Sequence, residues 1–144
     1  MAIVVLPYNH TLQRFWSGES RPDAIYKINL YSAFTFNAAA TTKAQAEVGC
    51  TQIATAFGYV QDAKTLTGVV VTQSGNDCYF DADDVSWTAS GGNISATHAL
   101  VFNDSGLNDP PVLSIDFDGT AAAPDGAPFQ IIWNAAGIIT VETT

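Results

Sequence analysis

The sequence predicts a mainly β protein: an antiparallel β-sandwich, with a jelly-roll-like arrangement as one form of it, and one short helix near the N-terminus. Apolar and polar residues alternate with a period of two over most of the chain, which is typical of strands with one buried face. Clusters of Gly, Pro, Asn and Asp separate these segments at near-regular intervals. The 144 residues suffice for one domain with a core, and a charged content of only 13% argues against a coiled coil.

The short helix is expected between residues 9 and 18. Asn9 is able to cap its first turn, and Gly18 is able to end it. Leu12, Phe15 and Trp16 follow helical spacing and would share one face. Two interpretations of this apolar face stay open: it packs against the rest of the domain, or it binds a partner protein.

The period-two segments predict seven to nine short strands. We therefore divide the chain into an N-terminal arm with the helix, residues 1–20, and a β-sandwich domain, residues 21–144. Residues 90–93, Ser-Gly-Gly-Asn, are expected to form a hairpin turn between two strands. The clearest strand segments are residues 26–30, 66–72, 78–83, 85–89, 94–102, 113–117, 129–133 and 137–142.

Three stretches have no such alternation. Residues 36–65 are rich in Ala, Thr and Gln and are predicted as a long connection, with at most short strands or one helical turn near residues 42–48. Residues 103–111 and 119–128 are crowded with Gly, Pro, Asn and Asp, which predicts surface loops. Within the strands, Trp87 and Trp133 fall on the apolar phase and are expected to be buried, and His98, on the same phase, is expected in the core or at an interface.

Charge is distributed unevenly along the chain. The net charge is −9, yet all five Lys and Arg residues lie in the first 64 residues, beside four acids. From residue 65 onward there are ten acids and no cation. Phosphate binding depends on clustered Lys and Arg, so nucleic acid is excluded as an expected partner, and an anionic membrane surface is disfavoured.

No apolar stretch reaches the roughly 18 residues of a membrane-spanning helix. The first residues, MAIVVLP, lack the cationic region and cleavage pattern of a secretion signal, so synthesis in the cytoplasm is expected. Cys50 and Cys78 are expected as free thiols, with a single bridge as the alternative outside a cell. Zinc would also require His10 and His98, at a spacing that fits no zinc finger.

One motif invites a catalytic interpretation. Residues 113–120, LSIDFDGT, resemble the phosphatase signature of the haloacid dehalogenase superfamily, in which Asp116 would be the nucleophile and Asp118 the general acid. That superfamily has a parallel α/β sheet with most of its catalytic domain after the motif, whereas only 25 residues follow Gly119 here. No Lys or Arg after Lys64 is available to neutralise a phosphoryl group. The prediction is therefore that the protein is not an enzyme and has no catalytic residues.

A second acidic cluster contains Asp81, Asp83 and Asp84. If its strand lay beside that of Asp116 and Asp118, four carboxylates could meet and bind Ca²⁺. Solvated carboxylates on an outer sheet face are the favoured alternative, so no metal ligand and no cofactor is predicted. A paired-carboxylate glycosidase is less favoured, since no acid is marked as buried.

The order of features resembles a family of small virion structural proteins of tailed bacteriophages, described as head decoration, cement or minor structural proteins. The resemblance runs from about residue 12 to residue 142. Its pieces are LQRFWSG, KINLYSA, NAAATTKAQAEV, LTGVVVT, YFDADDVSWTASGGNISATHALVFND, VLSIDFDG and FQIIWNAAGIITVE. The central strand–Trp–turn–strand segment is the most specific of them.

This resemblance implies a non-enzymatic protein of the virion that is made in the host cytoplasm and binds and stabilises the assembled capsid. The implied partners are the major capsid protein or other virion proteins, and a homo-oligomer is expected. The alternative is a tail or head fibre domain that binds host-surface carbohydrate through aromatic side chains such as Trp16, Trp87 or Tyr79.

The N-terminal arm is the predicted interface, because its side chains are too apolar for a free surface. Its apolar start could pair with an exposed sheet edge on a neighbouring protein. We expect the arm to matter more for binding than for folding, so that a chain beginning near Arg21 stays folded. The candidate interface residues are Ile3, Val4, Val5, Tyr8, Phe15 and Trp16.

Overall fold

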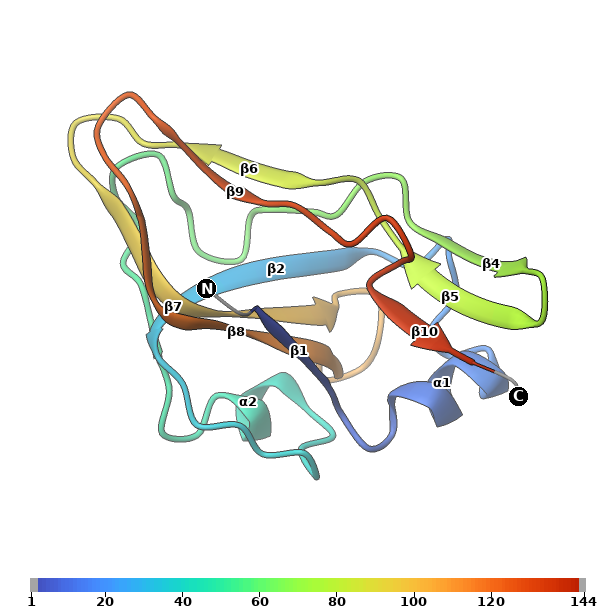
Figure 1. Ribbon diagram of the computed structural model, residues 1–144. Coiled ribbons are helices and arrows are strands. Elements are labelled where there is room, and N and C mark those ends of the chain that lie inside the picture. Colours follow the sequence, from blue (N-terminus) through green and yellow to red (C-terminus); the bar gives the residue numbers. More distant parts are fainter. Residues whose placement is uncertain (1–2, 143–144) are drawn as a thin grey trace.

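The computed structural model describes residues 3–142 and confirms a mainly β protein in which every strand pairing of the described chain is antiparallel (Figure 1). Two short helices accompany the strands, and no helix of the described chain is long and apolar enough to cross a membrane. The elements are β1 (Val4–Pro7), α1 (Thr11–Ser17), β2 (Tyr26–Ala33), α2 (Lys43–Ala46), β3 (Thr51–Gln52), β4 (Val70–Ser74), β5 (Asp77–Asp81), β6 (Val85–Thr88), β7 (Ile94–Asn103), β8 (Pro111–Ala123), β9 (Pro128–Ile131) and β10 (Ile139–Val141).

The strands form a five-stranded sheet in the order β1-β8-β7-β2-β3, a three-stranded sheet β10-β5-β4 and a two-stranded sheet β6-β9. The two smaller sheets lie over one face of the large one, as Figure 1 shows. The main core fills the space between them, with Ile28 and Leu30 from β2, Phe80 from β5, Trp87 from β6 and Phe129 from β9. The jelly-roll-like arrangement is not confirmed, because these sheets differ from the paired sheets of that fold.

A second, smaller core lies on the opposite face of the five-stranded sheet. Residues 36–65 form the predicted long connection and carry α2 and the two-residue β3. The segment folds over the sheet and buries Tyr31 and Leu100 together with Tyr8, Ala40 and Ala46. Both faces of β2 are therefore covered, which explains why Asn29, on the polar phase of the sequence, is fully buried.

The pairing of β6 corrects one sequence prediction. Residues 90–93 do not form a hairpin turn, because β6 pairs with β9 while β7 pairs with β2 and β8. The segment instead carries the chain from the two-stranded sheet to the five-stranded sheet. Its glycines serve close packing as well as turning: a Cβ at Gly92 would lie 2.5 Å from the ring of Phe57.

The phase of β7 also differs from the alternation in the sequence. The pairing with β8 shifts register between Ala96 and His98, and this irregularity exchanges the two faces of the strand. Ala96 and Ala99 consequently both belong to the main core, whereas Leu100 belongs to the second one. His98 is half-buried and stacks on Phe34, with ring centroids 5.4 Å apart.

Two further local predictions have mixed outcomes. Gly18 ends α1 in a left-handed conformation as expected, but the N-cap is His10 rather than Asn9, and its side chain makes no capping hydrogen bond. Trp87 is buried as expected, with 4% exposure. Trp133 is only half-buried, since it lies beyond the end of β9 and its indole N–H donates to the Asp83 carbonyl at 2.9 Å.

Candidate interaction surface

The structure divides the six candidate interface residues among three environments. Tyr8 is buried in the second core, with 2% exposure. Val5 and Phe15 are half-buried and pack against the main core, Phe15 on Phe80 with centroids 5.3 Å apart. Three residues remain at the surface: Ile3 at 55% exposure, Val4 at 45% and Trp16 at 83%.

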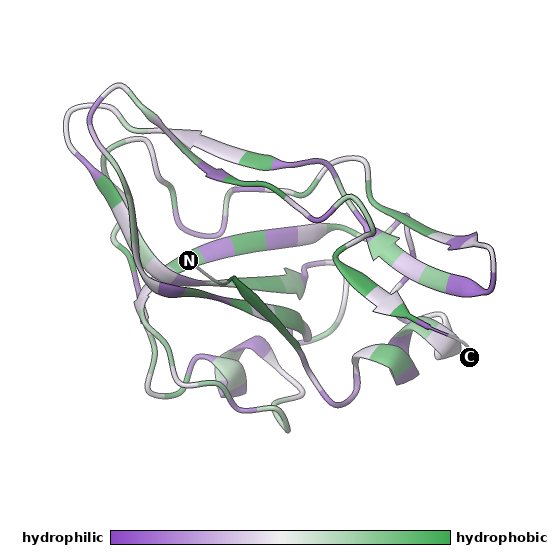
Figure 2. Ribbon diagram, viewed as in Figure 1, coloured by the Kyte–Doolittle hydropathy of each residue, from purple (hydrophilic) through white to green (hydrophobic). Residues whose placement is uncertain are grey.

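The N-terminal arm is continuous with the sheet. Strand β1 pairs with β8 of its own chain, with Val4 opposite Asp116 and Leu6 opposite Ser114. Figure 2 shows that β1 is hydrophobic, as is the part of β8 beside it. Pro7 is the last residue of β1, and the backbone then continues to α1, where the Thr11 hydroxyl donates to the Val112 carbonyl at 2.6 Å. The arm thus contributes to folding as well as to the surface.

The most apolar hollow of this surface lies between α1 and the three-stranded sheet. We call it the α1 groove; its volume is about 120 Å³. Phe15 closes its floor against Phe80, and Trp16 stands at its rim. The lining residues are Leu12, Phe15, Trp16, Val71, Cys78, Tyr79, Phe80, Ile139 and Val141.

Sequence reasoning found the helical wall of the α1 groove and missed its strand wall. Val71, Cys78 and Val141 lie in segments that the sequence predicted as strands, and no sequence signal indicated that these strands would border a groove. What the sequence could not show is that α1 covers only part of the sheet face that carries them. Val71 keeps 39% exposure, so the face is left partly open beside Trp16.

A second hollow, of about 480 Å³, lies beneath β1. Ile3 and Val5 form one side of it and Ile115 of β8 another. The segment after β9, including Ile132 and Trp133, forms the remaining side. The N-terminal arm therefore borders two hollows, one at β1 and the apolar one at α1.

The cations of the chain are largely neutralised within it. Four of the five form ion pairs: Arg14 with Glu19, Arg21 with Asp23, Lys27 with Asp104, and Lys43 with Asp62. Because none of these pairs leaves an open basic patch, the excess negative charge dominates the surface.

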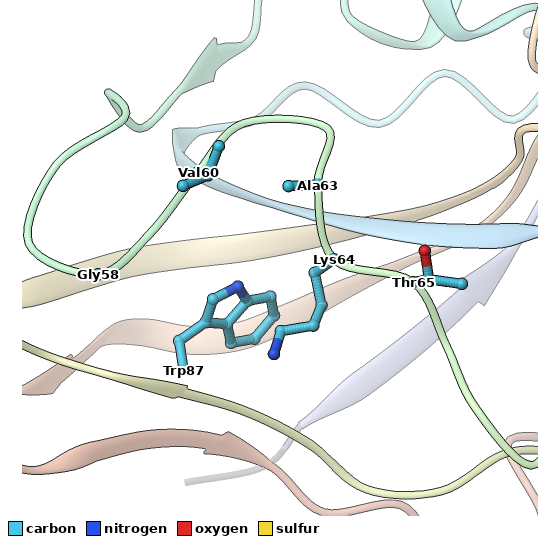
Figure 3. Close-up of a pocket in the computed structure, with 6 residues that line it drawn as sticks. All are labelled: Gly58, Val60, Ala63, Lys64, Thr65 and Trp87. Atoms are coloured by element: carbon cyan, nitrogen blue, oxygen red, sulfur yellow. The ribbon is translucent and has the colours of Figure 1, made fainter.

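The fifth cation, Lys64, lies over the ring of Trp87, 5.4 Å from its centroid, in a pocket of about 300 Å³ (Figure 3). Gly58, Val60 and Ala63 line the same pocket. The ammonium group covers the indole, and Trp87 is 4% exposed. The ring is therefore not presented for stacking on a sugar.

The two acidic clusters are separated. Asp81 lies on β5 in the three-stranded sheet, whereas Asp116 and Asp118 lie on β8 in the five-stranded sheet. Asp83 accepts a hydrogen bond from the Thr67 hydroxyl at 2.9 Å, and Asp84 accepts one from the Trp133 backbone N–H at 2.9 Å. The four carboxylates therefore do not meet, and residues 3–142 contain no cluster of three or more His, Cys, Asp or Glu suited to a metal ion.

The Asp116–Asp118 pair lies on an antiparallel strand, unlike the parallel sheet in which the haloacid dehalogenase signature occurs. Strand β8 is paired antiparallel on both sides, and Asp118 has a left-handed backbone, with φ 55°. The Asp118 N–H donates to the Asp116 carboxylate at 2.9 Å. The His98 ring nitrogen lies 3.6 Å from the same carboxylate. These contacts lie at the register irregularity of β8, where Asp116 pairs with His98 and Ala121 with Ala96.

We expect no hydrolysis of a generic phosphate monoester by the purified protein with Mg²⁺. The physical reason is that no Lys or Arg follows Lys64 to stabilise a phosphoryl group. The measurement compares wild type with Asp116→Asn over the same protein concentrations. Turnover in the wild type that the substitution abolishes would contradict a non-catalytic protein.

The two cysteines are free and lie in different parts of the fold. Cys78 is exposed at the α1 groove. Cys50 packs at the second core, and its burial there raises the pKa of its thiol.

No family model, no curated protein and no solved structure matches this chain.

Proposed function

We propose that the protein is a non-enzymatic structural protein of a phage virion that binds the assembled capsid and stabilises it. The observation that carries the proposal is the apolar α1 groove with Trp16 at its rim, 83% exposed. A large aromatic side chain beside an apolar hollow is the usual anchor of a protein interface. The sequence resemblance described above supplies the identity of the partner, the major capsid protein or another virion protein.

The rest of the N-terminal arm supports the same surface. Val4 is exposed on β1, an edge strand of the large sheet, and Ile3, the residue before β1, is exposed as well. Contact of a shell protein with Ile3 and Val4 would remove their apolar surface from water and so favour binding. Because a shell offers many equivalent sites, multivalent binding would give high overall affinity even if each contact area is small.

The charge distribution fits a location on the outside of a particle. A net charge of −9, with no Lys or Arg after residue 64, gives an acidic outer surface that keeps particles apart in solution. The exposure of the three named aromatics disfavours the fibre-domain alternative, because only Trp16 is strongly exposed. Tyr79 is half-buried and Trp87 is buried.

The test is co-sedimentation of the purified protein with capsids that lack it. We expect wild type to saturate the capsids and Trp16→Ala to weaken binding at least tenfold, as for an interface anchor. Val48→Ala is the matched control, since Val48 is 71% exposed beside α2, away from α1 (Figure 1). Both variants are expected to keep the wild-type melting temperature.

Two results would contradict the proposal. One is wild-type protein that does not sediment with capsids but binds host-surface glycan in a Trp16-dependent manner, which would favour the fibre domain. The other is equal capsid binding by Trp16→Ala and Val48→Ala, which would show that the capsid interface does not include the α1 groove.

A further inference from the structure

Strand β4 is an uncovered edge of the three-stranded sheet. It pairs with β5 on one side only, and all five of its residues, Val70–Ser74, are exposed. The strand contains no charged residue and no proline, and it begins with β-branched side chains. An edge of this kind presents unpaired backbone N–H and C=O groups, which are a template for another strand.

The other sheet edges of the described chain carry the features that usually prevent pairing. Strand β1 ends at Pro7, β9 begins at Pro128, and β3 and β10 are only two and three residues long. Strand β6 is flanked by the segment at residues 57–67, whose Phe57 and Thr67 carbonyls accept backbone hydrogen bonds from Ser90 and Asp83, just beyond the two ends of β6. Strand β4 is therefore the exception among these edges.

We propose that two copies of this chain pair through β4 in antiparallel orientation and form a symmetric dimer. The two three-stranded sheets would then join into one six-stranded sheet. A second copy is the fitting occupant because an uncharged β4 meets its own copy without repulsion at the strands, with Thr72 opposite Thr72. With the two-fold axis at Thr72, Val70 lies opposite the second copy's Ser74 and Val71 opposite its Gln73, so no charge faces another across the pair.

The dimer would also extend the α1 groove. Val71 and Gln73 lie on the same face of the sheet as Phe80 and Cys78, which pair with them on β5. Val71 lines the groove, and antiparallel pairing places the second copy's β4 directly beside it. The apolar face that α1 leaves partly open would thereby continue from one copy into the other.

Long-range charge opposes this dimer and predicts how it responds to salt. Each copy carries a net charge of −9. Salt screens that repulsion beyond about 10 Å at 0.1 M, while it leaves backbone hydrogen bonds and apolar contact in place. The dimer is therefore expected to become tighter as salt rises, whereas a dimer held by ion pairs would weaken.

The experiment measures molar mass by sedimentation as a function of protein concentration. We expect wild type to show a reversible monomer–dimer equilibrium and Thr72→Lys to abolish it, because two lysines would face each other across the axis. Thr140→Lys is the matched control: Thr140 lies on β10, in the same row across the sheet as Thr72, at the opposite edge. Both substitutions change the net charge equally, so a difference in dimerisation between the two variants is due to the position of Thr72 at the β4 edge.

A mixture of two variants sharpens the test. Thr72→Glu alone should be monomeric, and an equimolar mixture of Thr72→Lys and Thr72→Glu should recover the dimer, because opposite charges then meet. A wild type that stays monomeric at high concentration and high salt would overturn the proposal. So would dimerisation that Thr72→Lys leaves unchanged, with circular dichroism showing that the variant is folded. The dimer and the capsid-binding proposal are independent, since a monomer that binds capsids would contradict only the dimer.

Discussion

Replacing Trp87 with Ala is expected to lower the free energy of unfolding by about 3–5 kcal/mol, the range for a buried aromatic side chain. Trp87 is 4% exposed and stands between the two-stranded sheet and the large one. Its ring lies 6.1 Å from that of Phe129 in an edge-to-face arrangement, 6.1 Å from that of Tyr59, and under the Lys64 ammonium group. The substitution removes these contacts and leaves a cavity that the surrounding strands cannot fill.

Urea unfolding followed by far-ultraviolet circular dichroism measures this effect. Trp16→Ala is the matched control, because it removes the same side chain from a position that is 83% exposed. We expect it to change the free energy of unfolding by no more than about 0.5 kcal/mol, as for an ordinary surface substitution. Equal destabilisation by the two variants would contradict the burial of Trp87 between the sheets.

Local signals in the sequence were sufficient for most of the strands. Alternation in residues 26–30 correctly predicted which side of β2 faces the main core, with Tyr26, Ile28 and Leu30 buried there. Gly18 correctly predicted the end of α1, since a left-handed residue ends a helix most easily as glycine. These features depend on residues that are close together in the chain.

Features that depend on distant residues were not predictable in the same way. The sequence around residues 90–93 has the composition of a hairpin turn, yet β6 finds its partner in β9, some 40 positions along the chain. The register shift before His98 exchanges which residues of β7 face the main core, and the alternation of apolar and polar residues does not predict this shift. Asn29 is buried only because a separate segment folds over it, where its side chain bonds Asp62.

The N-terminal arm shows the same limit for the candidate site. Its apolar residues were correctly singled out, but composition could not divide them between core and surface. Tyr8, just after β1, is buried in the second core, whereas Val4, four residues earlier, is exposed. For this reason single substitutions at exposed positions test the binding role of the arm more cleanly than its deletion, which would also remove Tyr8 from the second core.

Alkaline pH is expected to unfold the protein cooperatively, because four of its five tyrosines are buried. Burial raises the pKa of each of these phenols above the ordinary value of about 10, and it raises that of Tyr26 to about 12. The Tyr31 hydroxyl also donates to the Glu47 carboxylate at 2.6 Å, a bond that the ionised phenol could not make. The buried tyrosines are Tyr8, Tyr26, Tyr31 and Tyr59.

The sign of the effect follows from proton binding. Between pH 10 and the raised pKa values, the unfolded chain has lost the phenolic protons and the folded chain retains them. Stability therefore falls as pH rises, by about 1.4 kcal/mol per pH unit for each such tyrosine. Four tyrosines together give a slope of roughly 5 kcal/mol per pH unit, which exhausts the stability of an ordinary domain within about one to three units.

Two signals followed in one titration test this expectation. The tyrosinate absorbance of the four buried phenols and the loss of the β circular dichroism signal should develop together in a single step at about pH 11 or above. Tyr8→Phe should move this step to higher pH, because it removes one of the four phenols while its hydroxyl makes no hydrogen bond within the described chain. Tyrosinate absorbance that develops fully near pH 10 while the circular dichroism stays native would contradict the burial of these side chains. The result would then question the second core, and with it the way that residues 36–65 fold over the large sheet.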